Sequence, residues 1–166
     1  MMDGSATTST IDKDTRRAIE DFIVDYAHMI DDDRLEEWPD YFTEKCTYRI
    51  INRENFVRER VVGVMECSSR GMLEDRIKAL REANVFEPHW YRHILSGTRI
   101  KGRNGDLFQV ETSFTVIRTM QEGDMSVFSA GKYVDEIIVE GGKPQFQKRV
   151  VVCDSNRIHT LIVIPI

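Results

Sequence analysis

The most informative part of the chain spans residues 91–154 and reads YRHILSGTRIKGRNGDLFQVETSFTVIRTMQEGDMSVFSAGKYVDEIIVEGGKPQFQKRVVVCD. Three turn clusters divide it: GRNGD at 102–106, EGD at 122–124 and EGGK at 140–143. The segments between them are rich in Val, Ile, Thr, Phe and Tyr, which favour strands. Strands joined by short turns of Gly, Asn and Asp are typical of consecutive hairpins. We therefore predict an antiparallel meander of four long strands.

The apolar residues of this meander alternate, which places them on one face of the predicted sheet. Four of them share that face in the second strand, namely Phe108, Val110, Phe114 and Val116. In the third strand the apolar positions change phase at Gly131, and Ile117 followed by Arg118 indicates a similar slip. Phase changes of this kind are typical of β-bulges, which bend a strand. We therefore expect a strongly curved sheet with a concave face that other elements fill.

The first half of the chain predicts helices. One helix begins at Asp12 or Asp14, either of which can cap its first turn, and it ends at the acidic run 31–33. Its apolar residues recur at helical spacing and form one stripe: Ile19, Phe22, Ile23, Tyr26, Met29 and Ile30. A short second helix is expected over residues 34–38, where Pro39 stops it. A third is expected over residues 70–84, with Leu73, Ile77 and Leu80 buried.

Between these helices we predict a first strand at residues 46–51, a charged surface loop at 53–59 and either a strand or an extended connection at 61–67. Helices early and strands late indicate an α+β fold. The expected architecture is a cone, with the N-terminal helices packed on a strongly curved antiparallel sheet. Residues 12–166 would form one domain, and the polar residues 1–11 a disordered start.

Composition excludes several classes of function. The chain has 166 residues and a formal net charge of −5, with acids and bases mixed, which argues against nucleic acid as a partner. No apolar run reaches about 18 residues, so no membrane-spanning helix is expected. The start of the chain lacks a signal-peptide pattern. The three cysteines lie far apart, which predicts free, buried thiols in a reducing cytoplasm.

Sequence motifs for catalysis or metal binding are missing. There is no dinucleotide-binding, P-loop or nucleophile-elbow motif, and no cysteine has a second cysteine or a histidine within four residues. His89 and His93 have the spacing of a helical metal site, but the residues around them predict a strand, which would hold them about 13 Å apart. We therefore predict no metal ligands, no cofactor-binding residues and no catalytic residues in this chain.

One polar cluster allows two interpretations. Asp75 and Arg76 on the third helix, with Arg92 and His93 on the following strand, stand beside apolar neighbours. They could form an acid–base group in a cone-shaped pocket. The interpretation we favour is a partly buried set of ion pairs, with Asp75 and Arg92 tying the helix to the strand, because buried charges require partners. Trp38, Tyr41 and Phe42 are likewise interpreted as core rather than as a ligand cage.

The chain also ends on an apolar tail, LIVIPI at residues 161–166. Chain ends are usually polar and loosely held. The tail could form a final edge segment on the domain's own sheet, or it could be a docking strip for another subunit. Deletion of the tail separates these two hypotheses, and we expect the docking role.

Four passages, taken in order and spacing, resemble the small (beta) subunit of aromatic-ring-hydroxylating, Rieske-type oxygenases. They are YAHMIDDDRLEEW at 26–38, FTEKCTY at 42–48, MLEDRI at 72–77 with YRHI at 91–94, and DS at 154–155 with the tail at 160–166. The resemblance implies the cystatin-like cone shared with nuclear transport factor 2 (NTF2). It also implies a mainly structural subunit without a cofactor.

The same resemblance implies partners. A catalytic large (alpha) subunit would hold a Rieske [2Fe–2S] cluster and a mononuclear iron, commonly in an α3β3 assembly, and electrons would come from NAD(P)H through a reductase and often a ferredoxin. Residues 48–56, YRIINRENF, resemble subunits of enzymes that attack aromatic carboxylates, with salicylate 5-hydroxylase first and terephthalate- or anthranilate-type enzymes next.

Two alternatives from other classes remain open on the same fold. One is a stand-alone isomerase, dehydratase or cyclase in which His93, Asp75 or His28 acts as the acid or base. The other is a ligand-binding module without chemistry. A cone filled by side chains would favour the subunit, whereas an open cavity lined by His93 and Asp75 would favour the enzyme.

Overall fold

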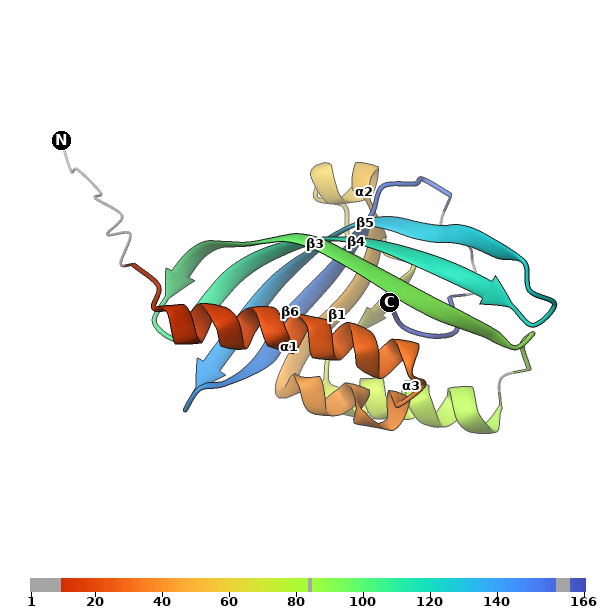
Figure 1. Ribbon diagram of the computed structural model, residues 1–166, viewed down its shortest axis with the longest axis horizontal. Helices are drawn as coiled ribbons and strands as arrows, with labels where there is room; N and C mark the ends of the chain where they lie inside the picture. The colour runs from red at the N-terminus through yellow and green to blue at the C-terminus, as the bar shows by residue number, and fades with distance from the viewer. Residues whose placement is uncertain (1–9, 84, 158–161) are drawn as a thin grey trace.

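The computed structural model describes residues 10–83, 85–157 and 162–166. A six-stranded sheet carries the helices, in the strand order β2-β1-β6-β5-β4-β3, and α1 lies across one of its faces (Figure 1). The elements in chain order are α1 (Lys13–Asp31), the 3₁₀ helix η1 (Leu35–Tyr41), β1 (Phe42–Asn52), α2 (Arg53–Val57), β2 (Met65–Cys67), α3 (Arg70–Glu82), β3 (His89–Asn104), β4 (Leu107–Met120), β5 (Met125–Glu140) and β6 (Lys143–Cys153).

The predicted meander is confirmed, because β3, β4, β5 and β6 pair antiparallel in sequence order. The predicted alternation holds as well: Phe108, Val110, Phe114 and Val116 are all buried. The sheet continues beyond the meander through β1, which pairs parallel with β6, with Ile50 opposite Val151. The sheet is therefore mixed, and the expectation of a purely antiparallel sheet is wrong at this pairing.

The phase change in β5 has a cause other than the one predicted. Val116 pairs with Ser129 and Ile117 with Val127, so Phe128 is the extra residue of a bulge. The slip expected near Ile117 is thus confirmed, but it lies on the facing strand, three residues before Gly131. Gly131 instead allows β5 and β6 to approach each other closely. A Cβ atom at this position would lie 1.9 Å from the carbonyl oxygen of Val152 on β6.

Helix α1 begins and ends as its sequence dictates. Asp12 caps the first turn, and its carboxylate accepts a hydrogen bond from a backbone N–H of that turn at 2.8 Å. At the other end Asp33 adopts a left-handed conformation, with φ of 57°. Its N–H donates to the carbonyl of Ile30, and the N–H of Arg34 donates to that of Met29. This pair of bonds is a Schellman motif, which stops the helix within the acidic run.

Two predicted boundaries change because tertiary packing overrides local propensity. The second helix continues through Pro39 as the 3₁₀ helix η1, since the buried side chains of Leu35 and Trp38 anchor it in the core. The first strand is longer than residues 46–51 at both ends, because β1 pairs with β6 from Phe42 onward.

The secondary structure of two other segments became clear only from the structure. Residues 53–59, predicted as a surface loop, contain the short helix α2, which begins where the side chain of Asn52 accepts a hydrogen bond from the N–H of Asn55. The ambiguous segment 61–67 forms strand β2 only in its last three residues, which pair with β1. The third helix agrees closely with its prediction: Ser69 caps it, and Leu73, Ile77 and Leu80 are buried.

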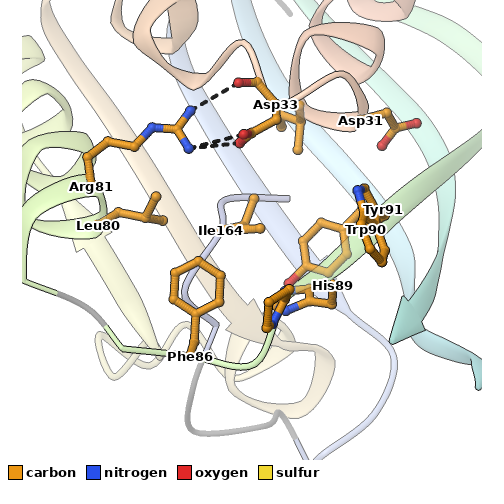
Figure 2. Close-up of a pocket in the computed structure, with 11 residues that line it drawn as sticks. Asp31, Asp33, Leu80, Arg81, Phe86, His89, Trp90, Tyr91 and Ile164 are labelled. Atoms are coloured by element: carbon orange, nitrogen blue, oxygen red, sulfur yellow. Dashed lines mark hydrogen bonds and ion pairs between the residues drawn. The ribbon is translucent and has the colours of Figure 1, made fainter. Parts of the chain in front are cut away.

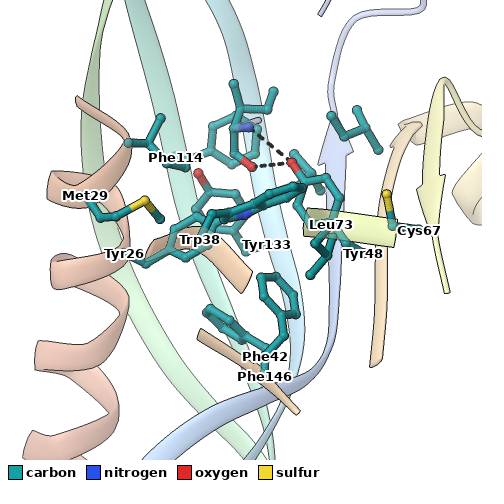
Figure 3. Packing of buried hydrophobic residues seen from close by; sticks show 14 of the residues in the cluster. Tyr26, Met29, Trp38, Phe42, Tyr48, Cys67, Leu73, Phe114, Tyr133 and Phe146 are labelled. Carbon is teal, nitrogen blue, oxygen red and sulfur yellow. Dashed lines mark hydrogen bonds between the residues drawn. The ribbon is translucent and has the colours of Figure 1, made fainter. Parts of the chain in front are cut away.

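The core between the helices and the sheet is densely aromatic. Tyr26 from α1, Trp38 from η1, Tyr48 from β1 and Phe146 from β6 are fully buried (Figure 3). Ring centroids of Trp38 and Tyr48 lie 5.0 Å apart, nearly perpendicular, and the indole N–H donates to the Tyr26 hydroxyl at 3.0 Å. Such edge-to-face pairs are a favourable arrangement of aromatic rings. The core interpretation of Trp38 and Phe42 is confirmed, and Tyr41 packs against them half-buried.

The apolar tail packs into this same core. Ile162, Ile164 and Ile166 are buried, and Ile166 exchanges two hydrogen bonds with the Tyr48 hydroxyl, at 2.8 and 3.1 Å. The hypothesis of an exposed docking strip is therefore wrong for these residues. The edge-segment hypothesis is right about the location but not the form, because residues 162–166 form no strand. Leu161, His159 and most of the predicted disordered start at 1–11 lie outside the described residues.

Candidate functional site

A pocket of about 450 Å³ opens between α1, α3 and the start of β3 (Figure 2). Three buried aliphatic side chains form one side of it: Ile30 from α1, Leu80 from α3 and Ile164 from the tail. Side chains at the end of α1, on α3 and on the segment entering β3 complete its lining. The size, and walls that combine apolar side chains with several polar ones, are typical of small-molecule sites.

An ion-pair network stands at this pocket. Arg81 on α3 donates to Glu36 at 2.7 Å and to both carboxylate oxygens of Asp33 at 3.1 Å. The hydrogen bonds that Arg81 donates to Glu36 and Asp33 raise the pKa of its guanidinium above its ordinary value. The same network binds the Asp33 carbonyl and so supports the left-handed turn that ends α1. Among the described lining residues Arg81 is therefore the one cation, and it is already paired with two carboxylates.

A row of rings forms another part of the lining. The centroids of Phe86 and His89 lie 5.5 Å apart, and those of His89 and Tyr91 lie 5.3 Å apart. Burial raises the pKa of the Tyr91 hydroxyl well above its ordinary value, so the hydroxyl stays protonated at neutral pH. His89 holds Nδ1 at 2.8 Å from the carbonyl of Glu87. Since a carbonyl only accepts, Nδ1 carries a hydrogen, and in the neutral tautomer that fits this contact Nε2 is the acceptor.

Beside the pocket lies a buried histidine–carboxylate pair. His93 Nδ1 lies 2.6 Å from Asp31 Oδ1, and the backbone N–H of His93 donates to Oδ2 of the same carboxylate at 2.8 Å. The side chains are 0% and 3% exposed. His93 Nε2 is buried and has no partner among the described residues. The pair joins the end of α1 to β3 and holds the Asp31 carboxylate in place at the pocket.

A second buried ion pair lies deeper in the core. Arg149 on β6 donates to both carboxylate oxygens of Asp135 on β5, at 2.9 and 2.7 Å, and both side chains are 0% exposed. The guanidinium also lies 3.9–4.3 Å from the ring centroids of Tyr133, Phe146 and Tyr26. Three ring faces around one cation compensate for part of its lost hydration.

The structure does not form the polar cluster predicted from sequence. Asp75 and Arg92 are exposed, so they are not a buried ion pair between helix and strand. Arg76 donates to the carbonyl of Ile162 in the tail at 3.2 Å. His93 is buried as expected but pairs with Asp31 rather than Asp75. His28 is exposed on α1.

Sequence reasoning missed Asp31, Asp135 and Arg149. Asp31 begins an acidic run, which the sequence indicates only as the end of the first helix. Asp135 did leave a signal, because it occupies the same strand phase as the buried Tyr133 and Ile137. A carboxylate at a core position requires a cationic partner, but which cation fills that role depends on strand pairing.

The described part of the chain holds no group of three or more His, Cys, Asp or Glu side chains placed to bind a metal ion. His89 and His93 lie on strand β3, as predicted, rather than on a helix. Nor does any helix within residues 10–83, 85–157 and 162–166 have the length and apolar character to span a membrane.

Comparison with known proteins provides independent evidence. A family model described as "Ring hydroxylating beta subunit" matches residues 26–160. The chain is 40% identical over 141 residues to the beta 1 subunit of the terminal oxygenase component of terephthalate 1,2-dioxygenase from Comamonas sp., covering 85% of this chain and 92% of that protein. It is 38% identical to the small subunit of anthranilate 1,2-dioxygenase from Burkholderia cepacia, covering 85% and 88%.

Solved structures agree. A beta subunit assigned to an aromatic-ring-hydroxylating dioxygenase of Novosphingobium aromaticivorans superposes with a TM-score of 0.83 at 41% identity, covering 90% of this chain and 95% of that one. Naphthalene 1,2-dioxygenase gives 0.74 at 14% identity over 95% and 88%, which shows the fold alone. The fold is NTF2-like, with an N-terminal helix on a six-stranded mixed sheet. By its family match and its extended identity to named relatives, the chain belongs to the ring-hydroxylating beta subunits.

Proposed function

We propose that the chain is the structural small subunit of a multicomponent Rieske-type oxygenase and supports assembly of an iron-containing large subunit. The observation that carries this proposal is the 40% identity to a terephthalate dioxygenase beta subunit over 92% of that protein's length. The interior supports a structural role, because its largest side chains, including Trp38, Tyr48 and Tyr133, are fully buried against one another.

We infer a partner of the alpha type, in an α3β3 assembly, that holds the Rieske cluster and the mononuclear iron. Electrons would reach it from NAD(P)H through a reductase, with or without a ferredoxin. No catalytic, cofactor-binding or metal-binding residue is assigned to the chain itself. We also infer that residues 12–166 form one domain, and that the bulge at Phe128 helps bend its sheet into a cone.

The substrate we propose is an aromatic carboxylate of the salicylate, terephthalate or anthranilate type. Support comes from the named relatives, since terephthalate and anthranilate both carry a carboxylate on a benzene ring. The large subunit would hold this substrate. Turnover of salicylate, terephthalate, anthranilate and naphthalene by the purified complex tests the class, and we expect hydroxylated product from a carboxylate but not from naphthalene.

Affinity purification of the tagged full-length chain from its native host tests the subunit role. We expect a larger protein to co-purify, with a brown Rieske absorption and iron that follow the complex through gel filtration. The same chain expressed alone is the control and should be colourless. A chain that elutes from the native host without a partner, and turns over a substrate by itself, would contradict the proposal.

The stand-alone enzyme is not supported. That alternative required His93 and Asp75 to line one open cavity. Asp75 is exposed on α3, and the 450 Å³ pocket is lined by neither of them. His28 is exposed as well, so none of the predicted acid–base residues faces this pocket.

A further inference from the structure

We propose that the pocket between α1, α3 and β3 binds a neutral, single-ring phenol, the class that includes phenol and catechol. This inference gives the chain a small-molecule site of its own, in addition to the assembly role. The pocket volume of about 450 Å³ lies within the range of about 300–1,000 Å³ that small-molecule sites occupy.

The shape and chemistry of the walls suit one aromatic ring. The side chains of Phe86, His89 and Tyr91 follow one another around part of the lining, with centroids 5.3–5.5 Å apart. Buried aliphatic side chains of Ile30 on α1 and Leu80 on α3 complete it. A ring placed between them would make edge or face contacts with aromatic side chains on one side and aliphatic contacts on the other.

Two polar atoms in this lining, the Tyr91 hydroxyl and His89 Nε2, have no hydrogen-bond partner among the described residues. The Tyr91 hydroxyl makes no hydrogen bond with any described residue, and burial keeps it protonated. The Glu87 carbonyl accepts the hydrogen on His89 Nδ1, so in the neutral tautomer that fits this contact Nε2 is the acceptor. A ligand hydroxyl both donates and accepts. It therefore matches this donor–acceptor combination, which a carboxylate cannot do because it only accepts.

The charged side chains of the lining disfavour an anionic ligand in this pocket. Asp31 and Asp33 both line the pocket. Asp31 is paired with His93 and Asp33 with Arg81, which also binds Glu36. The described lining residues therefore offer no unpaired cation to bind an aromatic carboxylate, whereas a neutral phenol needs none. The pocket therefore differs in ligand class from the carboxylate substrate proposed for the large subunit.

Nuclear magnetic resonance of the full-length chain offers a direct test, because the sequence has two tryptophans in contrasting places. Trp90 lines the pocket, and Trp38 is fully buried in the core with its indole N–H bonded to Tyr26. We expect catechol to shift the Trp90 indole signal saturably and to leave the Trp38 signal in place. Equal shifts of both signals, or no saturable shift, would overturn the proposal.

Calorimetric titration of variants tests the ligand class. Catechol binding to His89→Phe, which keeps a ring but loses the acceptor, should be about five- to tenfold weaker than to wild type. His28→Phe is the matched control, since His28 is exposed on α1 and does not line the pocket, and its affinity should be unchanged. Benzoate should bind at least tenfold more weakly than catechol. Benzoate binding as tight as catechol, or an unchanged affinity in His89→Phe, would refute the assignment.

The outcome is independent of assembly. Co-purification with a large subunit tests the structural role, whereas the titrations use the chain alone. If His89→Phe fails to fold by circular dichroism, the Trp90 and Trp38 signals of the wild-type chain still decide the question.

Discussion

Arg149 is a fully buried charged residue, and its surroundings must replace the water that would otherwise solvate it. Its side chain is 0% exposed, it is paired with a carboxylate that is equally buried, and it lies over three aromatic rings. Nη1 of this guanidinium has no partner among the described residues. A buried charge is tolerated only when other groups replace its hydration, so the rings and Asp135 together keep this cation in the core.

Removing the cation alone should therefore be costly. We expect Arg149→Met to lower the free energy of unfolding by about 3–5 kcal/mol, because Asp135 would be left as an unpaired buried carboxylate. Urea denaturation followed by circular dichroism measures the change. The double variant Arg149→Met with Asp135→Leu should recover much of the loss, since neither charge remains. If the single variant is as stable as wild type, the ion pair does not stabilise the fold.

The three buried thiols predict how the stability of the fold depends on pH. Cys46, Cys67 and Cys153 are buried and free. Burial raises the pKa of each, and that of Cys46 to about 11. Between the unfolded thiol pKa of about 8.5 and about 11, the folded chain holds protons that the unfolded chain has released. Stability should therefore fall as pH rises through this window.

Two measurements check the behaviour of the thiols. Urea midpoints at pH 8, 9 and 10 should decline in that order. Native protein at pH 8 should react slowly with a thiol reagent such as Ellman's, and all three thiols should react at once in denaturant. Rapid labelling of the native protein would contradict the burial of these side chains.

At the scale of elements, the contact between β5 and β6 depends on one missing side chain. A Cβ atom at Gly131 would lie 1.9 Å from a backbone oxygen of Val152, and backbone in a central strand pair cannot move aside cheaply. Gly131→Ala should destabilise the fold by several kcal/mol or prevent folding.

A second glycine serves as the control for that substitution. Gly71 lies in α3, and the nearest neighbour of a Cβ there is 3.9 Å away, so Gly71→Ala should be neutral or up to about 1 kcal/mol stabilising. Thermal unfolding of the two variants gives the comparison. Equal melting temperatures would show that β6 can move away from β5.

The tail is an element of the core rather than of an interface. Deleting residues 162–166 would expose the space that Ile162, Ile164 and Ile166 fill, at about 1.5–3 kcal/mol for each side chain. We expect the truncated chain to be largely unfolded at 25 °C. Tyr48→Phe, which removes both hydrogen bonds to Ile166, should cost about 1–3 kcal/mol.

Circular dichroism and gel filtration of the truncated chain separate the two roles of the tail. Val163→Ala is the matched control, because Val163 is only half-buried and its loss should cost less. A truncated chain that keeps the wild-type melting temperature but fails to join the large subunit would restore the docking hypothesis.

At the scale of the whole molecule, the chain combines a densely aromatic core with a pocket of about 450 Å³ at the end of α1. This arrangement is consistent with the proposed role of a subunit that stabilises its partner. We predict that the chain purified alone contains no stoichiometric iron or zinc, because its cysteines lack neighbouring ligands in the sequence. Elemental analysis by mass spectrometry measures this, and the complex with the large subunit, in which iron is expected, is the positive control.

The sequence by itself determined the elements whose cause is local. The turn clusters at 102–106, 122–124 and 140–143 predicted the meander, since Gly, Asn and Asp are what tight turns require. Helical spacing of the apolar residues likewise predicted α1 and α3, and the start of α1 was predicted at Asp12 or Asp14. Family resemblance, carried by four passages, predicted the beta subunit and its fold.

Only the tertiary structure decided how distant residues pair. The parallel contact of β1 with β6, the place of the tail in the core and the partners of His93 and Arg149 all join positions far apart in the chain. Asp31 lies 62 residues from His93, and no local pattern in the sequence identifies either residue as the partner of the other. Local propensity acts over a few residues, whereas burial of a charge is settled by which strands and helices meet around it.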